Sequence, residues 1–531
     1  MVGSADYAAF LADCHSSGDG GHCPGAVVTA ALVIEGKPDV DTARLDAIHE
    51  WNLKGKRATV LGLGREGTAL TRFLVEQGAH VAVSDLKDAA GLQQALAQLS
   101  DLPVRYFLGG HPLEILDCDV LFVSPGIPLD APIVVEARRR GLTLSSETRL
   151  FCRLCPAVII GITGSSGKTT TATLVAKMLE KGGHTVHLGG NIGNPLINRL
   201  PWIRPSDVVV MELSSFQLDF FGPVLDAEPH SDLASPLFPP GGWSPPIAAV
   251  LNVTPNHLDR HPTMEAYIAA KAKIVRYQRL QDYALLNKDD TVAQGFAPSC
   301  PGKVAFFSLR GQVPLGAYLN GDDLVLRNED GEVTVCSIGE IQLRGWHNVA
   351  NVLAACALAQ LCAVPVPAMA EVARTFAGVE HRLEPVCEWR GVWYYNDSIA
   401  TSPERAIAAL NSFAEPIVLL AGGRDKHLPW TEWAERVRQK VVHVILFGEA
   451  AALIERELRK LGDQAPPIHH AESLAHAVKL AEELAQPGQV VLFSPGGTSF
   501  DAFRDYAERG ETFKRLVHNL CRTDGSGQEE S

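Results

Sequence analysis

One ten-residue stretch constrains the fold of this chain more than any other: GITGSSGKTT, residues 161–170, which directly follows the apolar run 157–160. Its three glycines let the backbone curl so that several N–H groups surround an anion. A helix that begins at such a loop adds partial positive charge at its N-terminus. The stretch therefore predicts a phosphate-binding loop between a strand and a helix. In that loop Lys168 would reach the outer phosphates and the Thr169 hydroxyl would ligate Mg²⁺.

The spacing of this loop departs from the usual G-x-x-x-x-G-K-[ST] pattern. That pattern puts its first glycine at position 162, which is Ile162, whereas the glycine stands one residue earlier, at Gly161. A glycine-rich turn without a ligand is the alternative interpretation. The order of apolar run, loop, Gly-Lys-Thr and helix-like segment favours the phosphate loop.

The composition is that of a globular protein with several domains. The chain has 531 residues, of which 46% are hydrophobic and 20% charged, and a net charge of −14, which argues against a nucleic-acid partner. No apolar run approaches the ~18 residues of a membrane span. The apolar segment 26–34 follows acidic residues and no Lys or Arg, so a secretory signal is not expected. Eleven scattered cysteines favour reduced thiols, and we expect a cytoplasmic, membrane-free protein.

Four residues near the N-terminus have the composition of a zinc site. Cys14, His15, His22 and Cys23 lie in a glycine-rich segment without a persistent pattern. A coincidental cluster is the favoured interpretation.

A second glycine motif lies closer to the N-terminus. The segment RATVLGLGREG, residues 57–67, reads as a short strand that ends in G-x-G-x-x-G, and a second strand-like run ends at Asp85. Alone, this βαβ pattern predicts an NAD-type oxidoreductase, although the same turn serves any nucleotide diphosphate. Similar apolar runs end in polar or glycine-rich turns farther along the chain, at 119–128, 207–213, 247–253, 392–397, 416–423 and 489–497.

This alternation of strands and helices predicts an α/β protein with parallel sheets and sites at the carboxyl ends of strands. We expect three domains: a Rossmann-like N-terminal domain, a central P-loop ATPase-type domain and a Rossmann-like C-terminal domain. The expected segments are a flexible N-terminal extension at 1–50, domains at 51–153, 154–379 and 380–518, and a disordered tail at 519–531.

Three further motifs carry residues suited to metal and nucleotide chemistry. Glu212 ends an apolar run, and His257 follows the next run, with Lys271 at a helical distance beyond it. Asn348 and Asn351 are three apart and suited to hydrogen-bonding a flat heterocycle. For each motif alone, a capping or core role remains the alternative.

Taken together, the motifs resemble those of the Mur ligase family, the ATP-dependent amide-forming enzymes of bacterial cell-wall synthesis. The matching segments are GITGSSGKTT, GGNIGNP, ELSSFQL, NVTPNHLDRH, HNVANVLAA, EHRLE and NDSIATSP, in order between about residues 55 and 518. GLGREG, SPGIP and SPGGTSFDAFRDYAERGETF are typical of the members that add glutamate to UDP-N-acetylmuramoyl-L-alanine.

The resemblance implies a role for each matching position. Catalysis and metal binding would fall to Lys168, Thr169, Glu212, His257 and Lys271, the last as a carbamate that helps to hold two Mg²⁺ ions. ATP would be bound by Gly164, Ser165, Ser166, Gly167, Lys168, Thr169, Thr170, Asn348, Asn351, Arg382 and Asp397. The UDP substrate would contact Gly64, Arg65, Glu66, Asp85, Leu86, Lys87, Ser124 and Asn191, and glutamate would contact Thr401, Lys426, Ser499 and Tyr506. The N-terminal glycine motif is thereby reinterpreted as a UDP site.

The implied reaction passes through an acyl phosphate, which the amine of glutamate then attacks. One departure is plain: the family's usual NDSKATN is NDSIATS here, so Ile399 replaces a lysine near the reacting groups. D-glutamate is the expected substrate and L-glutamate the second candidate. The competing functions are a folylpolyglutamate synthase-like ligase, which should lack the N-terminal domain, a nicotinamide-dependent oxidoreductase and a non-catalytic nucleotide-binding protein. We expect a monomer.

Overall fold

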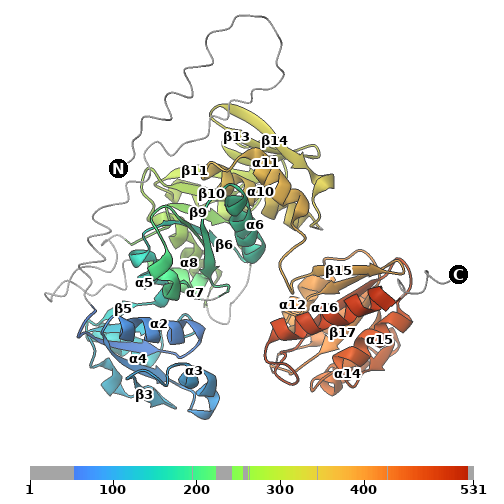
Figure 1. The fold of residues 1–531 in the computed structure, drawn as a ribbon, viewed down its shortest axis with the longest axis horizontal. Helices are drawn as coiled ribbons and strands as arrows, with labels where there is room; N and C mark the ends of the chain where they lie inside the picture. The colour runs from blue at the N-terminus through green and yellow to red at the C-terminus, as the bar shows by residue number, and fades with distance from the viewer. Residues whose placement is uncertain are drawn as a thin grey trace, which may run out of the picture.

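The computed structural model describes residues 53–193, 195–222, 242–254, 261, 263–343, 345–426 and 428–523. These residues form three α/β units, each built on its own sheet and coloured blue, teal to gold, and orange to red in Figure 1. The α/β class and the three-unit organisation expected from the sequence are confirmed.

The N-terminal unit holds a five-stranded parallel sheet in the order β3-β2-β1-β4-β5. Its strands are β1 (Arg57–Leu61), β2 (His80–Asp85), β3 (Arg105–Leu108), β4 (Val120–Val123) and β5 (Thr143–Ser145), and its helices α2 (Arg65–Glu76), α3 (Gln93–Gln98), α4 (Pro132–Arg139) and α5 (Glu147–Leu154). The glycine motif closes the turn from β1 to α2. A Cβ atom on Gly67 would lie 2.0 Å from the carbonyl oxygen of Gly62, so only glycine permits this close packing of helix on strand.

The central unit holds a nine-stranded sheet in the order β14-β13-β12-β11-β10-β9-β6-β8-β7. Its strands are β6 (Val158–Thr163), β7 (Val186–Gly190), β8 (Val208–Glu212), β9 (Ile247–Val250), β10 (Tyr283–Asn287), β11 (Lys303–Ser308), β12 (Gly316–Asn320), β13 (Asp323–Asn328) and β14 (Gly331–Ser337). Its helices are α6 (Lys168–Lys181), α7 (Ser215–Leu218), α8 (Met264–Arg276), α9 (Thr291–Gln294), α10 (Trp346–Leu361) and α11 (Val366–Thr375). The strands β6, β8 and β9, which lead into the candidate site, are neighbours in this sheet and run parallel.

The expectation of parallel sheets throughout is wrong for the edge of the central sheet. β12, β13 and β14 pair antiparallel. The connecting residues are 321–322 and 329–330, which are too few for the crossover helix that a parallel pair requires. Gly321 takes the first of these turns with a φ of 60°.

The C-terminal unit holds a six-stranded sheet in the order β15-β16-β20-β17-β18-β19, in which only the β15–β16 pair is antiparallel. Its strands are β15 (Glu384–Trp389), β16 (Val392–Asn396), β17 (Ile417–Gly422), β18 (Val441–Phe447), β19 (Ile468–His470) and β20 (Val490–Gly496). Its helices are α12 (Pro403–Leu410), α13 (Thr431–Lys440), α14 (Ala451–Arg459), α15 (Leu474–Leu484) and α16 (Tyr506–Thr523). α16 continues past residue 518, where we expect the C-terminal domain to end.

The hydrophobic core joins the first two units and leaves the third separate. One cluster of buried side chains runs from Val60 of β1 through Phe151 of α5 to Ile159 of β6. The C-terminal unit buries its own two clusters on the two faces of its sheet. The N-terminal and central units therefore pack as one body, whereas the C-terminal unit has a core of its own.

Among the described cysteines, one pair is not reduced. Cys387 of β15 and Cys521 of α16 form a disulfide, which differs from the expectation of free thiols. The other seven described cysteines are free, and most are buried.

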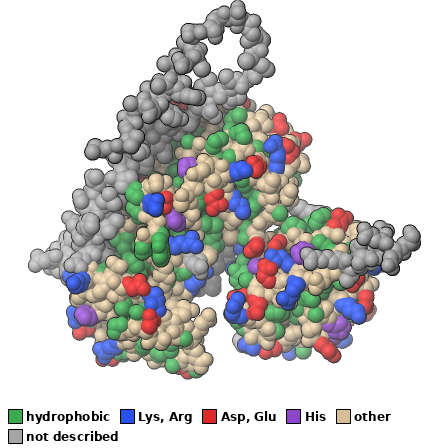
Figure 2. Space-filling model, viewed as in Figure 1, with side chains coloured by type: hydrophobic (Ala, Val, Ile, Leu, Met, Phe, Trp, Pro, Cys, Tyr) green, Lys and Arg blue, Asp and Glu red, His purple; other side chains and the backbone are tan. Residues whose placement is uncertain are grey.

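The face seen in Figure 2 carries acidic and basic side chains interspersed over all three units. In the part of the chain that the structure describes, no helix is both long enough and apolar enough to cross a bilayer.

Candidate active site

The predicted phosphate loop lies between β6 and α6, as its sequence indicates. Gly167, the last residue before α6, has a φ of 80°, which L side chains rarely adopt. A Cβ atom at this position would also lie 2.4 Å from Oδ1 of Asn351. The side chain of Asn252, at the end of β9, accepts a hydrogen bond from the backbone N–H of Ser166 at 2.8 Å. Asn252 thus anchors the loop by hydrogen bonds, while Asn351 packs closely against Gly167.

Gly161, the displaced glycine of the motif, belongs to β6 and not to the loop. A Cβ atom there would lie 2.5 Å from Pro245 and 3.1 Å from Leu213. This glycine therefore serves the packing of the strand, which explains why it need not keep the usual spacing.

A carboxylate at the end of β8 faces the start of α6. The hydroxyl of Thr169 donates to Oε2 of Glu212 at 2.7 Å, and the side-chain amide of Asn191 donates to Oε1 at 2.7 Å. Glu212 is 2% exposed. The adjacent hydroxyl and carboxylate oxygens are hard donors of the kind that Mg²⁺ prefers, so these residues fit a magnesium ion.

Two lysines converge on the carbonyl oxygen of Gly164 in the same loop. Nζ of Lys168 donates to it at 2.9 Å, and Nζ of Lys271, on α8, donates at 3.0 Å. Burial lowers the pKa of Lys168, and Glu212 opposes that effect. Burial, together with the charge of Lys168, lowers the pKa of Lys271 well below its ordinary value.

Lys271 is 1% exposed, and Nζ also donates to Oγ1 of Thr163 at 3.3 Å. A lysine with a lowered pKa is more often the neutral amine, which is the form that reacts with CO₂ to give a carbamate. The site thus has the chemistry that a carbamylated lysine requires. The predicted metal ligand His257 lies outside the described residues.

The two asparagines predicted to bind adenine lie on α10. Nδ2 of Asn351 donates to Oδ1 of Asn348 at 3.1 Å, which places both side chains on one face of the helix. Asn351 is buried, and its Oδ1 accepts from Thr171 of α6 at 3.3 Å. Asn351 thereby joins α10 to the phosphate loop, while Asn348 is half-buried.

Most residues predicted to bind the UDP substrate gather at the carboxyl ends of β1, β2 and β4, whereas Asn191 lies after β7 in the central unit, where it contacts Glu212. Asp85 accepts hydrogen bonds from the backbone N–H groups of Leu63 at 2.7 Å and Lys87 at 2.8 Å. Leu86 between them is 71% exposed. Ser124, after β4, donates to the carbonyl oxygen of Gly62 at 3.0 Å. Gly64, Arg65 and Glu66 begin α2 at the same edge.

Glu66 also takes part in a buried polar cluster between the first two units. The side-chain amide of Gln217 donates to Oε1 of Glu66 at 3.0 Å, and Glu147 accepts from the backbone N–H of Ile197 at 3.3 Å. Burial raises the pKa of Glu66 to about 7. Burial and the neighbouring Glu66 raise the pKa of Glu147 to about 8. The two carboxyl groups where the units meet therefore have pKa values near neutral pH, far above the ordinary value of a glutamate.

Arg382 of the C-terminal unit acts electrostatically on Lys168 of the phosphate loop, and Asp397 acts on Arg382. Burial lowers the pKa of Arg382, and the charges of Glu212 and Asp397 oppose that effect. Asp397 accepts from Ser494 at 2.8 Å, and burial raises its pKa to about 7. Because Arg382 interacts with Glu212 of the central unit, the C-terminal unit faces the phosphate loop.

Three of the four residues predicted to bind glutamate meet at the loop after β16, where Thr401 is part of the loop and Lys426 and Tyr506 contact it. Nζ of Lys426 donates to the hydroxyl of Thr401 at 3.4 Å. Ser499 is buried, and Tyr506 begins α16 with its ring edge-on to His381. The backbone carbonyl of Tyr506 accepts from Ser398 at 2.7 Å.

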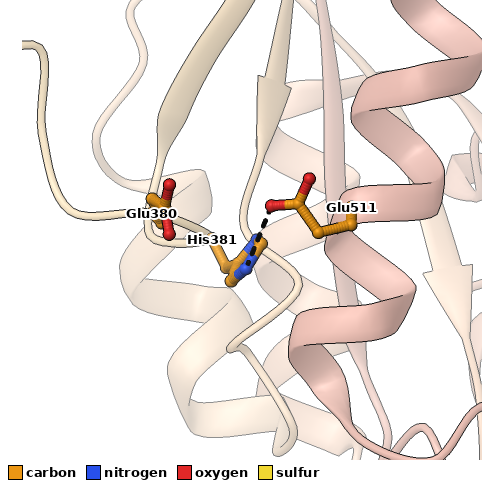
Figure 3. A group of neighbouring side chains, drawn as sticks. All are labelled: Glu380, His381 and Glu511. Atoms are coloured by element: carbon orange, nitrogen blue, oxygen red, sulfur yellow. Dashed lines mark ion pairs between the residues drawn. The ribbon is translucent and has the colours of Figure 1, made fainter. Parts of the chain in front are cut away.

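A cluster of Glu380, His381 and Glu511 at the start of the C-terminal unit also has metal-binding composition, and Figure 3 shows His381 pointing toward Glu511. Nζ of Lys514 lies 2.6 Å from Glu511, 3.1 Å from Glu384 and 4.0 Å from Glu380. This ammonium group supplies the positive charge that a metal would bring. The cluster therefore has a structural role, in which its carboxylates position His381. The carbonyl oxygen of His381 in turn accepts a hydrogen bond from the N–H of Ile399 at 3.1 Å.

Sequence reasoning missed several residues that shape the site. Asn252 lies two residues after the end of β9, where a polar residue is a usable signal. Tyr267 lies one helical turn before Lys271, contacts Ser165 through its hydroxyl at 3.0 Å, and places its ring 4.8 Å from the Lys271 ammonium group. Arg405 belongs to none of the motifs, and only the structure shows that it contacts the loop at Ile399.

Comparison with known proteins relates all three units to one family. Residues 56–146 match the family described as "Mur ligase MurD-like, N-terminal domain". Residues 162–233 and 241–359 match "Mur ligase middle domain", and residues 381–497 match "Mur ligase, glutamate ligase domain".

Named relatives cover almost the same length. The chain is 44% identical over 469 residues to the UDP-N-acetylmuramoylalanine–D-glutamate ligase of Symbiobacterium thermophilum, covering 88% of this chain and 98% of that protein. It is 40% identical over 474 residues to the protein of the same name from Acetivibrio thermocellus, covering 88% and 97%. The solved structure of the UDP-N-acetylmuramate–alanine ligase from Thermotoga maritima shares the fold, with a TM-score of 0.52 and 18% identity over 87% of this chain and 99% of that one.

Proposed function

The chain belongs to the Mur ligase family, and from that membership we propose that it joins glutamate to UDP-N-acetylmuramoyl-alanine in peptidoglycan precursor synthesis. Members of this family are ATP-dependent ligases that use Mg²⁺. The observation that carries the proposal is the 44% identity to a ligase of that name over 98% of its length. The cluster of Lys168, Thr169, Glu212 and Lys271 also supports the proposal, because these side chains suit the binding of phosphate and Mg²⁺.

We assign the three units to three substrates. The N-terminal unit would hold the uridine nucleotide at Asp85 and the start of α2, because the exposed backbone N–H groups there favour an anion. The central unit would hold ATP at the phosphate loop. The C-terminal unit would close over both and bring glutamate, because Arg382 acts on Glu212 across the two units.

The first step makes the alanyl carboxylate a better acceptor. Its oxygen attacks the γ-phosphorus of ATP, ADP leaves, and an acyl phosphate forms. Lys168, at the N-terminus of α6, is placed to stabilise negative charge on the transferring phosphoryl group.

The second step forms the amide. The amine of glutamate attacks the acyl carbon, a tetrahedral adduct forms, and phosphate leaves as the amine loses a proton. Lys426 and Thr401 would orient glutamate for this attack.

Mg²⁺, when bound, neutralises the phosphate oxygens and stabilises the charge that develops on them. Thr169 and Glu212 would hold it, with the carbamate of Lys271 as a further oxygen donor. Burial favours the neutral Lys271 amine, which is the form that gains CO₂. Protein labelled with ¹³C-bicarbonate should therefore show a carbamate carbon by NMR that is absent from Lys271→Ala.

We propose D-glutamate as the amino-acid substrate, because the two named relatives from Symbiobacterium thermophilum and Acetivibrio thermocellus carry it in their names. L-glutamate is the second candidate, because Ile399 offers no charge to a carboxylate at a position where the family pattern has a lysine. We also propose a cytoplasmic, monomeric enzyme, since its substrates are a nucleotide sugar, ATP and an amino acid.

One assay tests the function and the enantiomer together. Phosphate release is measured with ATP, Mg²⁺, UDP-N-acetylmuramoyl-L-alanine and either D- or L-glutamate, with omission of each substrate as the control. Release that requires all substrates and has a higher kcat/KM for D-glutamate is the expected result. A preference for L-glutamate would overturn the proposed D-glutamate substrate but not the proposed ligase activity. Phosphate release that does not depend on an amino acid would overturn the proposed function.

A further inference from the structure

Two cations converge on the short loop from Ile399 to Thr401. Nη1 of Arg405, on the first turns of α12, donates to the carbonyl oxygen of Ile399 at 3.4 Å. Nζ of Lys426, from the loop after β17, donates to the hydroxyl of Thr401 at 3.4 Å. The N–H of Thr401 donates to the same Ile399 carbonyl at 2.8 Å, which keeps the loop compact. Both cations are therefore anchored within two residues of each other.

Among the described residues neither cation forms an ion pair, although the charge of Arg405 also acts on Asp397. Within the same residues, the only hydrogen bonds of Arg405 and Lys426 are these long ones to neutral oxygens. Burial lowers the pKa of Lys426, and the one neighbouring charge that contributes is that of Arg405. Two like charges at close range repel, and a bound anion would relieve that repulsion.

The positive charge extends from this loop to the phosphate loop. Arg405 also acts on Lys168 and Arg382, and it lowers the pKa of both. The charge of Arg405 therefore acts both on groups proposed to hold the phosphates and on one proposed to hold glutamate. Its side chain is exposed, so a small solute can reach it.

We propose that Arg405 binds one carboxylate of glutamate and leaves the other to Lys426, which the family resemblance already assigns to glutamate, and that Arg405 supplies the cation that Ile399 does not. This inference rests on the proposed function. Glutamate is an amino acid with two carboxylates, and the loop that carries the Thr401 hydroxyl is contacted by two cations without ion pairs. The ATP phosphates already have Lys168 and the loop N–H groups. The planar fork of a guanidinium group suits a carboxylate in particular.

The test compares glutamate with its two monoamides. Glutamine lacks the side-chain carboxylate and isoglutamine lacks the α-carboxylate, so each removes one anion and keeps the shape. Arg405→Gln should raise KM for glutamate about 10-fold or more and lose a similar factor of discrimination against one amide. Lys426→Gln should lose discrimination against the other amide. KM for ATP should change less than about 3-fold in both variants, and Arg456→Gln, an exposed arginine of α14, should behave as wild type.

A second variant tests the role of position 399. Ile399→Lys introduced into Arg405→Gln should recover most of the lost affinity for glutamate, because it returns one cation to the same loop. Thermal melting of each variant shows whether it is folded. If the folded double variant does not regain affinity for glutamate, the proposal that Arg405 replaces a cation at position 399 is overturned.

The remaining outcomes separate the inference from the function. A folded Arg405→Gln that keeps the wild-type KM for glutamate and discriminates fully against both amides would overturn the inference. A selective rise in KM for ATP would also overturn it, because Arg405 would then serve the nucleotide. Neither result contradicts the proposed ligase activity. That proposal is overturned only if the wild-type protein releases no phosphate with glutamate.

Discussion

The hydroxyl oxygen of Thr169 lies 2.7 Å from a carboxylate oxygen of Glu212, at the point where the first residues of α6 meet the end of β8. The two side chains meet because β6 and β8 are parallel neighbours whose carboxyl ends share one edge of the sheet. Lys168 and Lys271 approach the same loop from opposite sides. The site therefore depends on the loop, on two lysines and on the packing of the units around them.

Lys168→Ala should lower kcat/KM for ligation by about 10³-fold, equivalent to about 4 kcal/mol of transition-state stabilisation. Lys168 is the first residue of α6, where its ammonium group would meet the phosphates of the proposed ATP site. Lys177→Ala, on the exposed face of the same helix, is the matched control and should keep normal activity. Phosphate release close to wild type in Lys168→Ala would remove the proposed ATP site.

Gly167→Ala should weaken ATP binding roughly 10²-fold, because the loop can no longer keep its shape. An alanine here takes a φ of 80° and places its Cβ atom 2.4 Å from Oδ1 of Asn351. Gly183→Ala is the control: it has a φ of 91° and no neighbour within 4 Å, so it carries only backbone strain of about 1–2 kcal/mol. Titration calorimetry with a non-hydrolysable ATP analogue measures both, and equal ATP affinity in the two variants would contradict the prediction.

Lys271→Ala should be nearly inactive, and millimolar short carboxylates such as formate or acetate should restore part of its activity. The small acid would replace the anionic oxygens of the carbamate at the metal. Lys273→Ala, on the same helix but paired with Asp219, should stay active and show no response to carboxylates. Full activity of Lys271→Ala without any carboxylate would show that this lysine takes no part.

The stability of the first two units should fall as the pH rises from about 5 to 8. Glu66 and Glu147 have pKa values of about 7 and about 8 in the folded protein, above the ordinary 4.5. In this window the folded state therefore binds more protons than the unfolded state, and unfolding becomes easier as protons leave, by on the order of 1 kcal/mol per pH unit.

Glu147→Gln removes one of the two acids and keeps an oxygen for the N–H of Ile197. Its midpoint of chemical denaturation should depend less on pH than that of wild type, and it should be the more stable protein at pH 8. Glu180→Gln, an exposed position of α6, should follow wild type. An unchanged pH dependence in Glu147→Gln would contradict the assignment of these two carboxyl groups.

Much of the fold follows from local patterns. The apolar runs that end at Asp85, Glu212 and Asn252 each form or lead out of a strand as predicted, because continuous apolar segments followed by polar turns are typical of buried parallel strands. The edge strands β12, β13 and β14 were missed, because their two-residue turns interrupt the βα alternation from which the parallel sheets were inferred.

The sequence by itself determined the phosphate loop, the three α/β units and the family, because these depend on residues close together in the chain or on motifs in a set order. The tertiary structure alone decided that Glu66 and Glu147 share a buried site and that Arg405 and Lys426 meet at one loop. Each pair joins a predicted site residue to one that belongs to no motif, Glu147 or Arg405, on another element of the chain. Their charge and pKa depend on burial and distance, and neither quantity is set until the sheets and helices pack together.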